Sequence, residues 1–219
     1  MSGIGLIRLM NWLSPVFPTG GFAYSGGLEQ AVRDGVITDE AALGDWLETL
    51  IGFGSIRNDL ILLATAWKQQ AVGEALDDLA ATAVALCGSA ERKLETVVQG
   101  AAFADALKSW PEAERIACPP DTPLPVIVGA ACSAGGIALN DALSGYLQAF
   151  VSNQLQAAIR LSVIGQTGAA RLLAKLEPLL VKAANEAAKL TLEDLGSAAF
   201  MAEIASMNHE RLDGRLFRS

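Results

Sequence analysis

The chain has few side chains that could act as catalytic groups or metal ligands, and its single histidine limits which sites are possible. His209 is the only histidine among 219 residues. An HExxH zinc motif and any mechanism built on paired histidines are therefore excluded. A Ser-His-Asp triad would have to use His209, close to a chain end, and no GxSxG turn supplies its serine. The sequence predicts no catalytic centre, metal site or cofactor, and we interpret His209 and Glu210 as a structural or interface pair.

A glycine-flanked loop (residues 20–27) could present aromatic side chains. Glycine pairs at 20–21 and 26–27 enclose Phe22 and Tyr24. No GKS or GKT follows, as a P-loop requires, and no strand pattern precedes the loop, as a Rossmann turn requires. Two interpretations stay open. The glycines form a tight turn before a short helix that starts near Ser25, or the loop offers Phe22 and Tyr24 to a partner.

Two further sets of polar residues have structural explanations. The charged run 91–95 (ERKLE) is typical of a solvent-exposed helix face. Arg160 and Gln166 lie near the end of the longest expected helix, where their side chains can bond to free carbonyl groups or contribute to an interface. The three cysteines, Cys87, Cys118 and Cys132, include no CxxC pair. We therefore expect buried free thiols rather than a disulfide framework.

Charge and hydropathy narrow the classes of partner. With 16 basic and 24 acidic residues, the net charge is −8, which repels phosphate backbones and argues against nucleic-acid binding. The longest uncharged stretches, 122–140 and 142–159, are interrupted by proline, glycine or amides and do not resemble membrane spans. The N-terminus lacks the features of a signal peptide. These observations favour a cytoplasmic protein with protein partners and no membrane association.

Helical periodicity runs along nearly the whole chain. Apolar residues recur at steps of three and four, and alanine and leucine supply much of the 52% hydrophobic content. The pattern predicts one all-α domain over residues 1–219, with roughly eight to ten helices. Residues 110–125, which hold five prolines, form the expected linker within this domain. The other expected boundaries are N-caps at Thr38 and Asn140, breaks at Gly73, Gly88, Gly135 and Gly165, a kink at Pro178, and a last helix from a Thr191–Asp194 capping box to about Met207.

The last residues, which we call the tail (residues 207–219), combine apolar and basic side chains. Leu216 and Phe217 stand between Arg215 and Arg218. Chain ends are usually polar and disordered unless something holds them, and aromatic and arginine side chains dominate interface hot spots. The tail therefore packs on its own body or docks into another protein, and the residues alone favour neither.

Four blocks of the chain resemble one known family, the F-type urease accessory proteins. The segment 13–29 (LSPVFPTGGFAYSGGLE) is similar to the family's signature loop, and 152–161 (SNQLQAAIRL) to its central block. Ile164-Gly165-Gln166-Thr167 is similar to its Leu-Gly-Gln-Thr motif. His209-Glu210, followed by RLFRS at 215–219, is similar to its terminal motif. The blocks occur in the family's order and span nearly the whole chain.

The resemblance implies an all-helical, dimeric adaptor in urease maturation. Such a protein binds the D/H-type accessory protein, recruits the nickel-carrying G-type GTPase and acts on apo-urease. A role in GTP hydrolysis is also implied. By the same resemblance, the partner-binding residues would be Phe22 and Tyr24 for the GTPase, and His209, Glu210, Arg215, Leu216, Phe217 and Arg218 for the D/H-type protein.

Two other classes of function stay open. A helical enzyme acting on a small molecule would need polar groups that converge in a cavity, and only Tyr146, Arg160, Gln166 and His209 are available for it. A general helical scaffold unrelated to nickel would need no such cavity.

Overall fold

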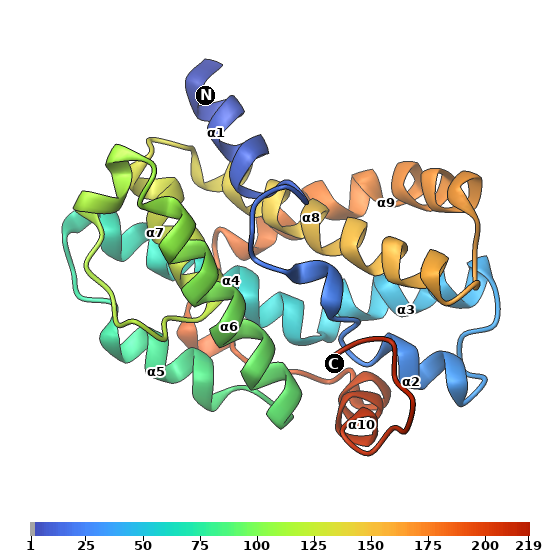
Figure 1. Cartoon of the computed structure of the whole chain (residues 1–219). Coiled ribbons are helices and arrows are strands. Elements are labelled where there is room, and N and C mark those ends of the chain that lie inside the picture. The colour runs from blue at the N-terminus through green and yellow to red at the C-terminus, as the bar shows by residue number, and fades with distance from the viewer. Residues whose placement is uncertain (1–2) are drawn as a thin grey trace.

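The computed structural model describes residues 3–219, and over this range the chain is all-helical with no strand (Figure 1). The prediction of an all-α domain is confirmed. There are ten α-helices and three short 3-10 helices in the described range. The α-helices are α1 (Gly3–Trp12), α2 (Leu28–Arg33), α3 (Glu40–Phe53), α4 (Ser55–Val72), α5 (Asp77–Ala85), α6 (Ala90–Leu107), α7 (Leu124–Ala134), α8 (Leu139–Arg160), α9 (Gln166–Ala187) and α10 (Phe200–His209); the 3-10 helices are η1 (Gly21–Ala23), η2 (Pro111–Arg115) and η3 (Leu192–Asp194).

Several helix boundaries follow local chemistry, and two N-terminal boundaries are shifted by one residue from the expected positions. Asp39, not Thr38, caps α3, because its carboxylate accepts a hydrogen bond from the Ala42 amide at 2.9 Å. The expected cap at Asn140 is wrong, since α8 already begins at Leu139. Gly73 ends α4 with a φ of 76°, as glycine at that position allows. Pro178 lies inside α9, which continues past it to Ala187.

The prediction for the last helix is wrong at its start. The Thr191–Asp194 capping box is present, but it opens only η3. The chain then runs irregularly to Phe200, because its backbone bonds elsewhere: the Gly196 amide donates to the Asn58 side chain and the Ala198 amide to the Phe53 carbonyl, at 2.9 and 2.8 Å. These tertiary bonds replace the helical bonds that the capping box would have started.

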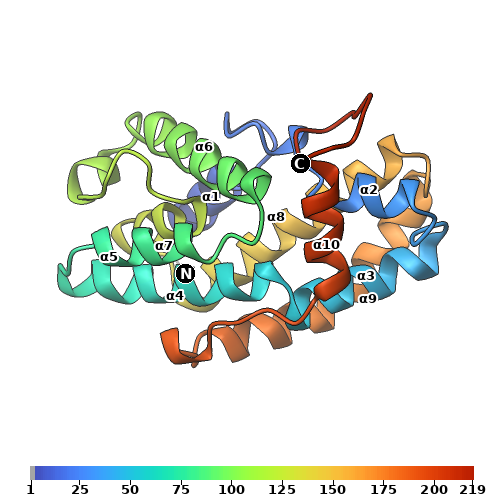
Figure 2. The same ribbon diagram turned by 90° about the horizontal axis from the view of Figure 1, so that it is seen from below.

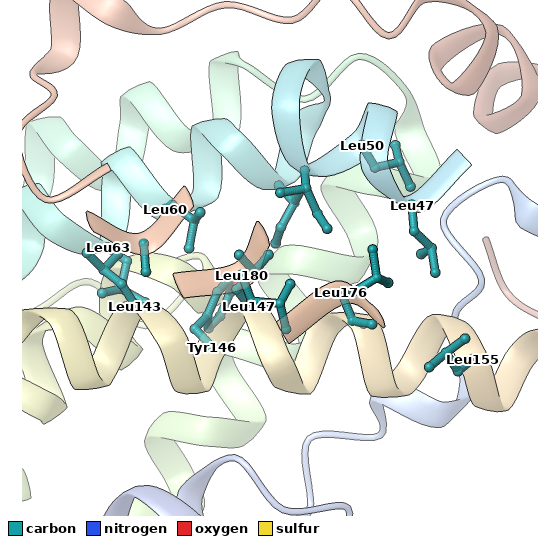
Figure 3. Close-up of a cluster of buried hydrophobic side chains, with 14 of the residues drawn as sticks. Leu47, Leu50, Leu60, Leu63, Leu143, Tyr146, Leu147, Leu155, Leu176 and Leu180 are labelled. Atoms are coloured by element: carbon teal, nitrogen blue, oxygen red, sulfur yellow. The ribbon is translucent and has the colours of Figure 1, made fainter. Parts of the chain in front are cut away.

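The core lies where α3 and α4 pack against α8 and α9 (Figure 3). Leucines from all four helices meet there, and Tyr146 of α8 joins them. On the other side, α7 packs on α4 at very short range. A Cβ added at Gly129 of α7 would lie 2.4 Å from the Leu63 carbonyl oxygen, so only glycine permits this approach.

The chain ends by returning towards its beginning. Helix α10 lies against α2, and the tail then passes α2 and finishes beside the glycine-flanked loop (Figures 1 and 2). The N-terminus of α6 faces the same place, because the Ala90 amide donates to Glu210 at 2.9 Å. Four parts of the chain that are distant in sequence therefore converge: the loop with the adjoining α2, the N-terminus of α6, the end of α8 and the tail.

Candidate functional site: a buried charge cluster that fixes the tail

His209 is fully buried between two glutamates. Its side chain is 0% exposed, with Nδ1 2.7 Å from a Glu91 carboxylate oxygen and Nε2 3.1 Å from one of Glu29. Glu29 comes from α2 and Glu91 from the first turn of α6. His209, the last residue of α10, thus connects α2 to α6. Its partners Glu29 and Glu91 are 62 residues apart in the sequence, and both precede it by more than a hundred residues.

Glu29 holds the tail by its backbone. Its carboxylate accepts hydrogen bonds from the amides of Leu216 at 2.9 Å and Phe217 at 3.0 Å, in addition to the contact with His209. Burial acts to raise the pKa of Glu29, but the bonds from Leu216, His209 and Phe217 outweigh burial and lower the pKa below its usual range. Glu29 is therefore an ionised acceptor around which the tail folds.

Glu91 is the second acceptor of the cluster. It forms an ion pair with Arg215 of the tail, and it lies in the first turn of α6, where the helix dipole favours negative charge. The charge-run prediction was wrong at this position, because Glu91 is buried and binds the tail. Arg92 and Glu95 are also largely covered, and only Lys93 and Leu94 in that run are exposed.

The tail pairs with the glycine-flanked loop through backbone bonds. The Arg218 amide donates to the Ala23 carbonyl at 2.7 Å, and the Ser25 amide donates to the Ser219 carbonyl at 2.8 Å. Asn153 of α8 supports the loop from beneath, since its amide donates to the Tyr24 carbonyl at 3.1 Å. The residues of the tail alone favour neither packing on the chain's own body nor docking into another protein, and in this structure the tail packs on its own body.

Arg160 joins the loop to the tail. Its guanidinium lies 4.2 Å from the centre of the Phe217 ring and donates to the Phe22 carbonyl at 2.6 Å. The prediction that Arg160 bonds to carbonyls at its own helix end is therefore wrong, because its partner is a loop 138 residues away. Gln166 is exposed at the start of α9, and no hydrogen bond found in residues 3–219 links it to this cluster.

The predicted partner-binding residues divide into buried and exposed groups. Tyr24 is 2% exposed and Phe217 is 3% exposed, so both serve the fold in this conformation. Phe22 is 71% exposed and Leu216 is 60% exposed. Glu210, Arg215 and Arg218 are exposed as well.

A second apolar surface lies next to the tail on the outer side of α10. We call it the α10 apolar face, and its members Phe200, Met201, Ile204 and Met207 are each between 47% and 70% exposed. Four large apolar side chains in solvent on one ten-residue helix are unusual for a surface with no partner. Sequence periodicity did not single out this face, because both sides of α10 carry apolar residues.

Sequence reasoning missed the acceptors that organise the site. Glu29, Glu91 and Ser25 were not chosen as site residues, although Glu29 and Ser25 lie in the segment similar to the family's signature loop. A buried glutamate has no local signature in a sequence, since the partners of Glu29 and Glu91 in the tail lie 118 or more residues away. The sequence signal that did point to this site was the unusual combination of Leu216 and Phe217 with flanking arginines in the tail.

A large groove of about 1170 Å³ lies between the N-terminal segment, α6 and α8. Tyr146 and Arg160 line it, but Gln166 and His209 do not. Its charged wall is already paired internally: Arg92 forms ion pairs with Asp59 and Glu95, and Tyr146 donates to Asp59 at 3.2 Å. Asp59, Arg92 and Tyr146 are thus engaged with one another.

Fold and site together define an all-helical protein whose tail is fixed by a buried charge cluster, beside two exposed apolar surfaces. The family model of UreF matches residues 37–177. Over 218 residues the chain is 51% identical to the urease accessory protein UreF of Mesorhizobium japonicum, covering all of this chain and 98% of the relative. Over 214 residues it is 51% identical to the urease accessory protein UreF of Brucella ovis and to UreF 1 of Brucella suis, covering 98% of this chain and 94% of each.

The chain therefore belongs to the UreF family of urease accessory proteins. A urease accessory protein assists an enzyme and is not itself one, so the prediction of a non-catalytic protein is confirmed by membership. No helix within residues 3–219 is long and apolar enough to cross a membrane.

Proposed function

We propose that this chain is an adaptor in urease maturation that bridges the D/H-type accessory protein and the nickel-carrying G-type GTPase, so that nickel reaches apo-urease. Nickel is cargo here, and the adaptor uses no cofactor of its own. Modulation of GTP hydrolysis by the G-type protein, a homodimeric state and a cytoplasmic location belong to the same proposal.

The observation that carries the proposal is the pair of exposed apolar surfaces held rigid around the tail. Leu216 and the α10 apolar face form the surface that we assign to the D/H-type protein, with Arg215 and Arg218 at its edge. Phe22 lies on the loop that Arg160 connects to the tail, and it forms the surface that we assign to the GTPase. Both surfaces depend on one ordered tail, which suits a protein that must hold two partners together.

Pull-downs and a urease activation assay with single variants test this assignment. Burial of one leucine or phenylalanine side chain contributes about 1.5–3 kcal/mol, or roughly 10- to 150-fold in affinity. Leu216→Ser should weaken capture of the D/H-type protein, Phe22→Ser should weaken capture of the GTPase, and both should lower urease activation. Tyr24 is unsuitable as a test because its side chain is buried.

Val181→Ser is the matched control, since Val181 is 55% exposed on α9. It should leave both contacts and urease activation unchanged. Wild-type affinity in Leu216→Ser and in a chain cut after Met207 would refute the tail assignment, and intact GTPase recruitment in Phe22→Ser would refute the loop assignment.

A further inference from the structure

The groove between the N-terminal segment, α6 and α8 changes from polar to aromatic along one face of α6. Glu95, Gln99 and Phe103 all line it, and they stand at i, i+4 and i+8, so they project from the same face of the helix. The rise of an α-helix places the Cα atom of Glu95 about 12 Å from that of Phe103. The groove therefore has a polar end and an aromatic end at a separation that a small organic molecule can span.

The polar end holds amide oxygens whose own amide groups are already used as donors. The side-chain amide of Gln99 donates to the Glu95 carboxylate at 3.2 Å. The side-chain amide of Gln154 donates to the Ser25 carbonyl at 3.0 Å. The Oε1 atom of Gln154 is buried, and no hydrogen-bond partner for it exists within residues 3–219. Both glutamines thus offer acceptors to whatever occupies this end of the groove.

Ser219 and Gly26 place Gln154 beside Glu95. The Ser219 hydroxyl donates to a Glu95 carboxylate oxygen at 3.3 Å and accepts from the Gly26 amide at 3.4 Å. A Cβ added at Gly26 would lie 3.4 Å from Nε2 of Gln154. Glu95, Gln99 and Gln154 therefore lie together, and we call these three residues the acceptor end of the groove.

The acceptor end also carries a negative charge that is incompletely paired. Arg92 pairs closely with Asp59, whereas its distance to the Glu95 carboxylate is 3.7 Å. Burial raises the pKa of Glu95, and Arg92 only partly offsets this effect. The charged residues that line the groove are three acidic ones (Asp59, Glu95 and Glu203) and two basic ones (Arg92 and Arg160). A positive charge in the groove would therefore be favourable next to Glu95.

Apolar side chains form the other end. Phe17 and Trp12 pack on Phe103, with ring centroids 4.9 and 6.5 Å apart, and Leu13 and Phe150 also line the groove. Small-molecule sites usually combine such apolar walls with a few convergent polar groups, in volumes of about 300–1000 Å³. The groove, at about 1170 Å³, is large enough for a ligand of this kind.

We propose that the groove binds a small amphipathic organic cation, with an ammonium, amidinium or guanidinium head at the acceptor end and an aromatic or alkyl body against Phe103. Such a head has several N–H donors and no acceptor, so it satisfies the Glu95 carboxylate and the free oxygen of Gln154 together. Glu95 is the residue that selects positive charge. Glu95 and Phe103 belong to neither of the surfaces assigned to protein partners, so this site is separate from the adaptor role.

Three probes with the same body test the selection of charge: the cation 4-phenylbutylammonium, the neutral 4-phenylbutanol and the anion 4-phenylbutanoate. NMR titration of the full chain near neutral pH gives the three dissociation constants. The Trp12 indole and the Gln154 side-chain amide report whether a probe lies in the groove. The cation should bind about 10- to 100-fold more tightly than the alcohol, because it adds a charge-assisted hydrogen bond. The anion should bind more weakly than the alcohol.

A pair of glutamine variants assigns this selection to one residue. Glu95→Gln keeps the shape of the side chain and removes its charge, so the preference for the cation over the alcohol should disappear. Glu114→Gln makes the same change in net charge at an exposed position in η2 that does not line the groove, and it should keep the wild-type preference.

Three results would overturn the proposal. Equal affinities of the wild type for the cation and the alcohol would show that only apolar contact binds the probes. A cation that leaves the Trp12 and Gln154 signals unchanged at millimolar concentration would show that the groove is not its site. An unchanged preference for the cation in Glu95→Gln would show that Glu95 does not select charge. The comparison of probes on the wild type needs no variant, so it decides the question even if Glu95→Gln fails to fold.

Discussion

At the residue scale, the site is a small set of charged groups that are buried because each has a partner. Burying an ion pair rarely adds much stability over an apolar pair, but removing one member leaves a charge without compensation. Glu29 illustrates this asymmetry, since three hydrogen bonds converge on one carboxylate. The benefit is specificity: only a tail that brings its own amides and an arginine to the right place satisfies both glutamates.

Acid should open the tail through Glu29. Because the pKa of Glu29 is lowered in the folded chain, its contribution is fully present above the unfolded-state pKa and is lost as pH falls through the folded-state pKa. Loss of the charged acceptor removes bonds that are each worth about 1.5–3 kcal/mol. Exchange of the Leu216 and Phe217 amides, measured from pH 6 down to pH 3, should show this loss of protection.

Two variants define the acid effect. Glu29→Gln should have a weakly protected tail already at pH 6, with little further change in acid. Glu40→Gln removes an exposed carboxylate whose pKa is lowered by its bond to Arg171, and it should leave the tail's acid response intact. Equal acid profiles for wild type and Glu29→Gln would show that Glu29 does not hold the tail.

At the element scale, the sequence predicts what local patterns encode. Periodicity and caps predicted the existence of the long helices and several of their ends, because a helix satisfies its backbone from within. The end of α8 was predicted at Gly165, whereas the helix ends at Arg160. They failed over 195–199, where backbone groups bond to Asn58 and Phe53 across the fold. They also misjudged Glu91, because a buried glutamate and a solvated one look alike along a single helix. The tail was recognised as unusual, but its acceptors could not be found without the tertiary contacts.

The approach of α10 to α2 depends on Gly27. Its φ is 83°, and an added Cβ would lie 2.8 Å from the backbone nitrogen of Ser206 in α10. Gly27→Ala should therefore push α10 and the tail outward, with increased proteolysis and hydrogen exchange of residues 200–219. Gly35→Ala is the matched control, since its φ of 72° gives similar backbone strain while an added Cβ meets open space. Equal tail protection in the two variants would contradict this role for Gly27.

At the scale of the whole molecule, the tail packs on a body whose largest share of buried apolar side chains comes from other elements. More than half of the main cluster of buried side chains comes from α3, α4, α8 and α9, whereas the charge cluster lies at the junction of α2, α6 and α10 (Figures 2 and 3). Phe217 of the tail and two alanines of α10, Ala202 and Ala205, also belong to the main cluster. Tail opening would expose Phe217 and change the surface offered to partners, while the leucines of α3, α4, α8 and α9 can keep their contacts with one another. We therefore expect variants of the body and variants of the tail to differ in their effects on Tm and on hydrogen exchange.

Gly129→Ala should weaken the body as a unit. The added Cβ would lie 2.4 Å from the Leu63 carbonyl oxygen and 3.0 Å from the Ala66 Cβ, and both belong to α4, so two packed helices must separate. Overpacking of this kind costs about 1–3 kcal/mol, and each kcal/mol lowers Tm by about 2–4 °C for a chain of this size. Calorimetry should show a lower Tm, and hydrogen exchange should rise in α4 and α7 before it rises in the tail.

Gly52→Ala in α3, where an added Cβ meets open space, should instead stabilise by about 0.5–1 kcal/mol. If Gly129→Ala melted at or above the temperature of Gly52→Ala, the close contact of α7 with α4 would not be what stabilises the body.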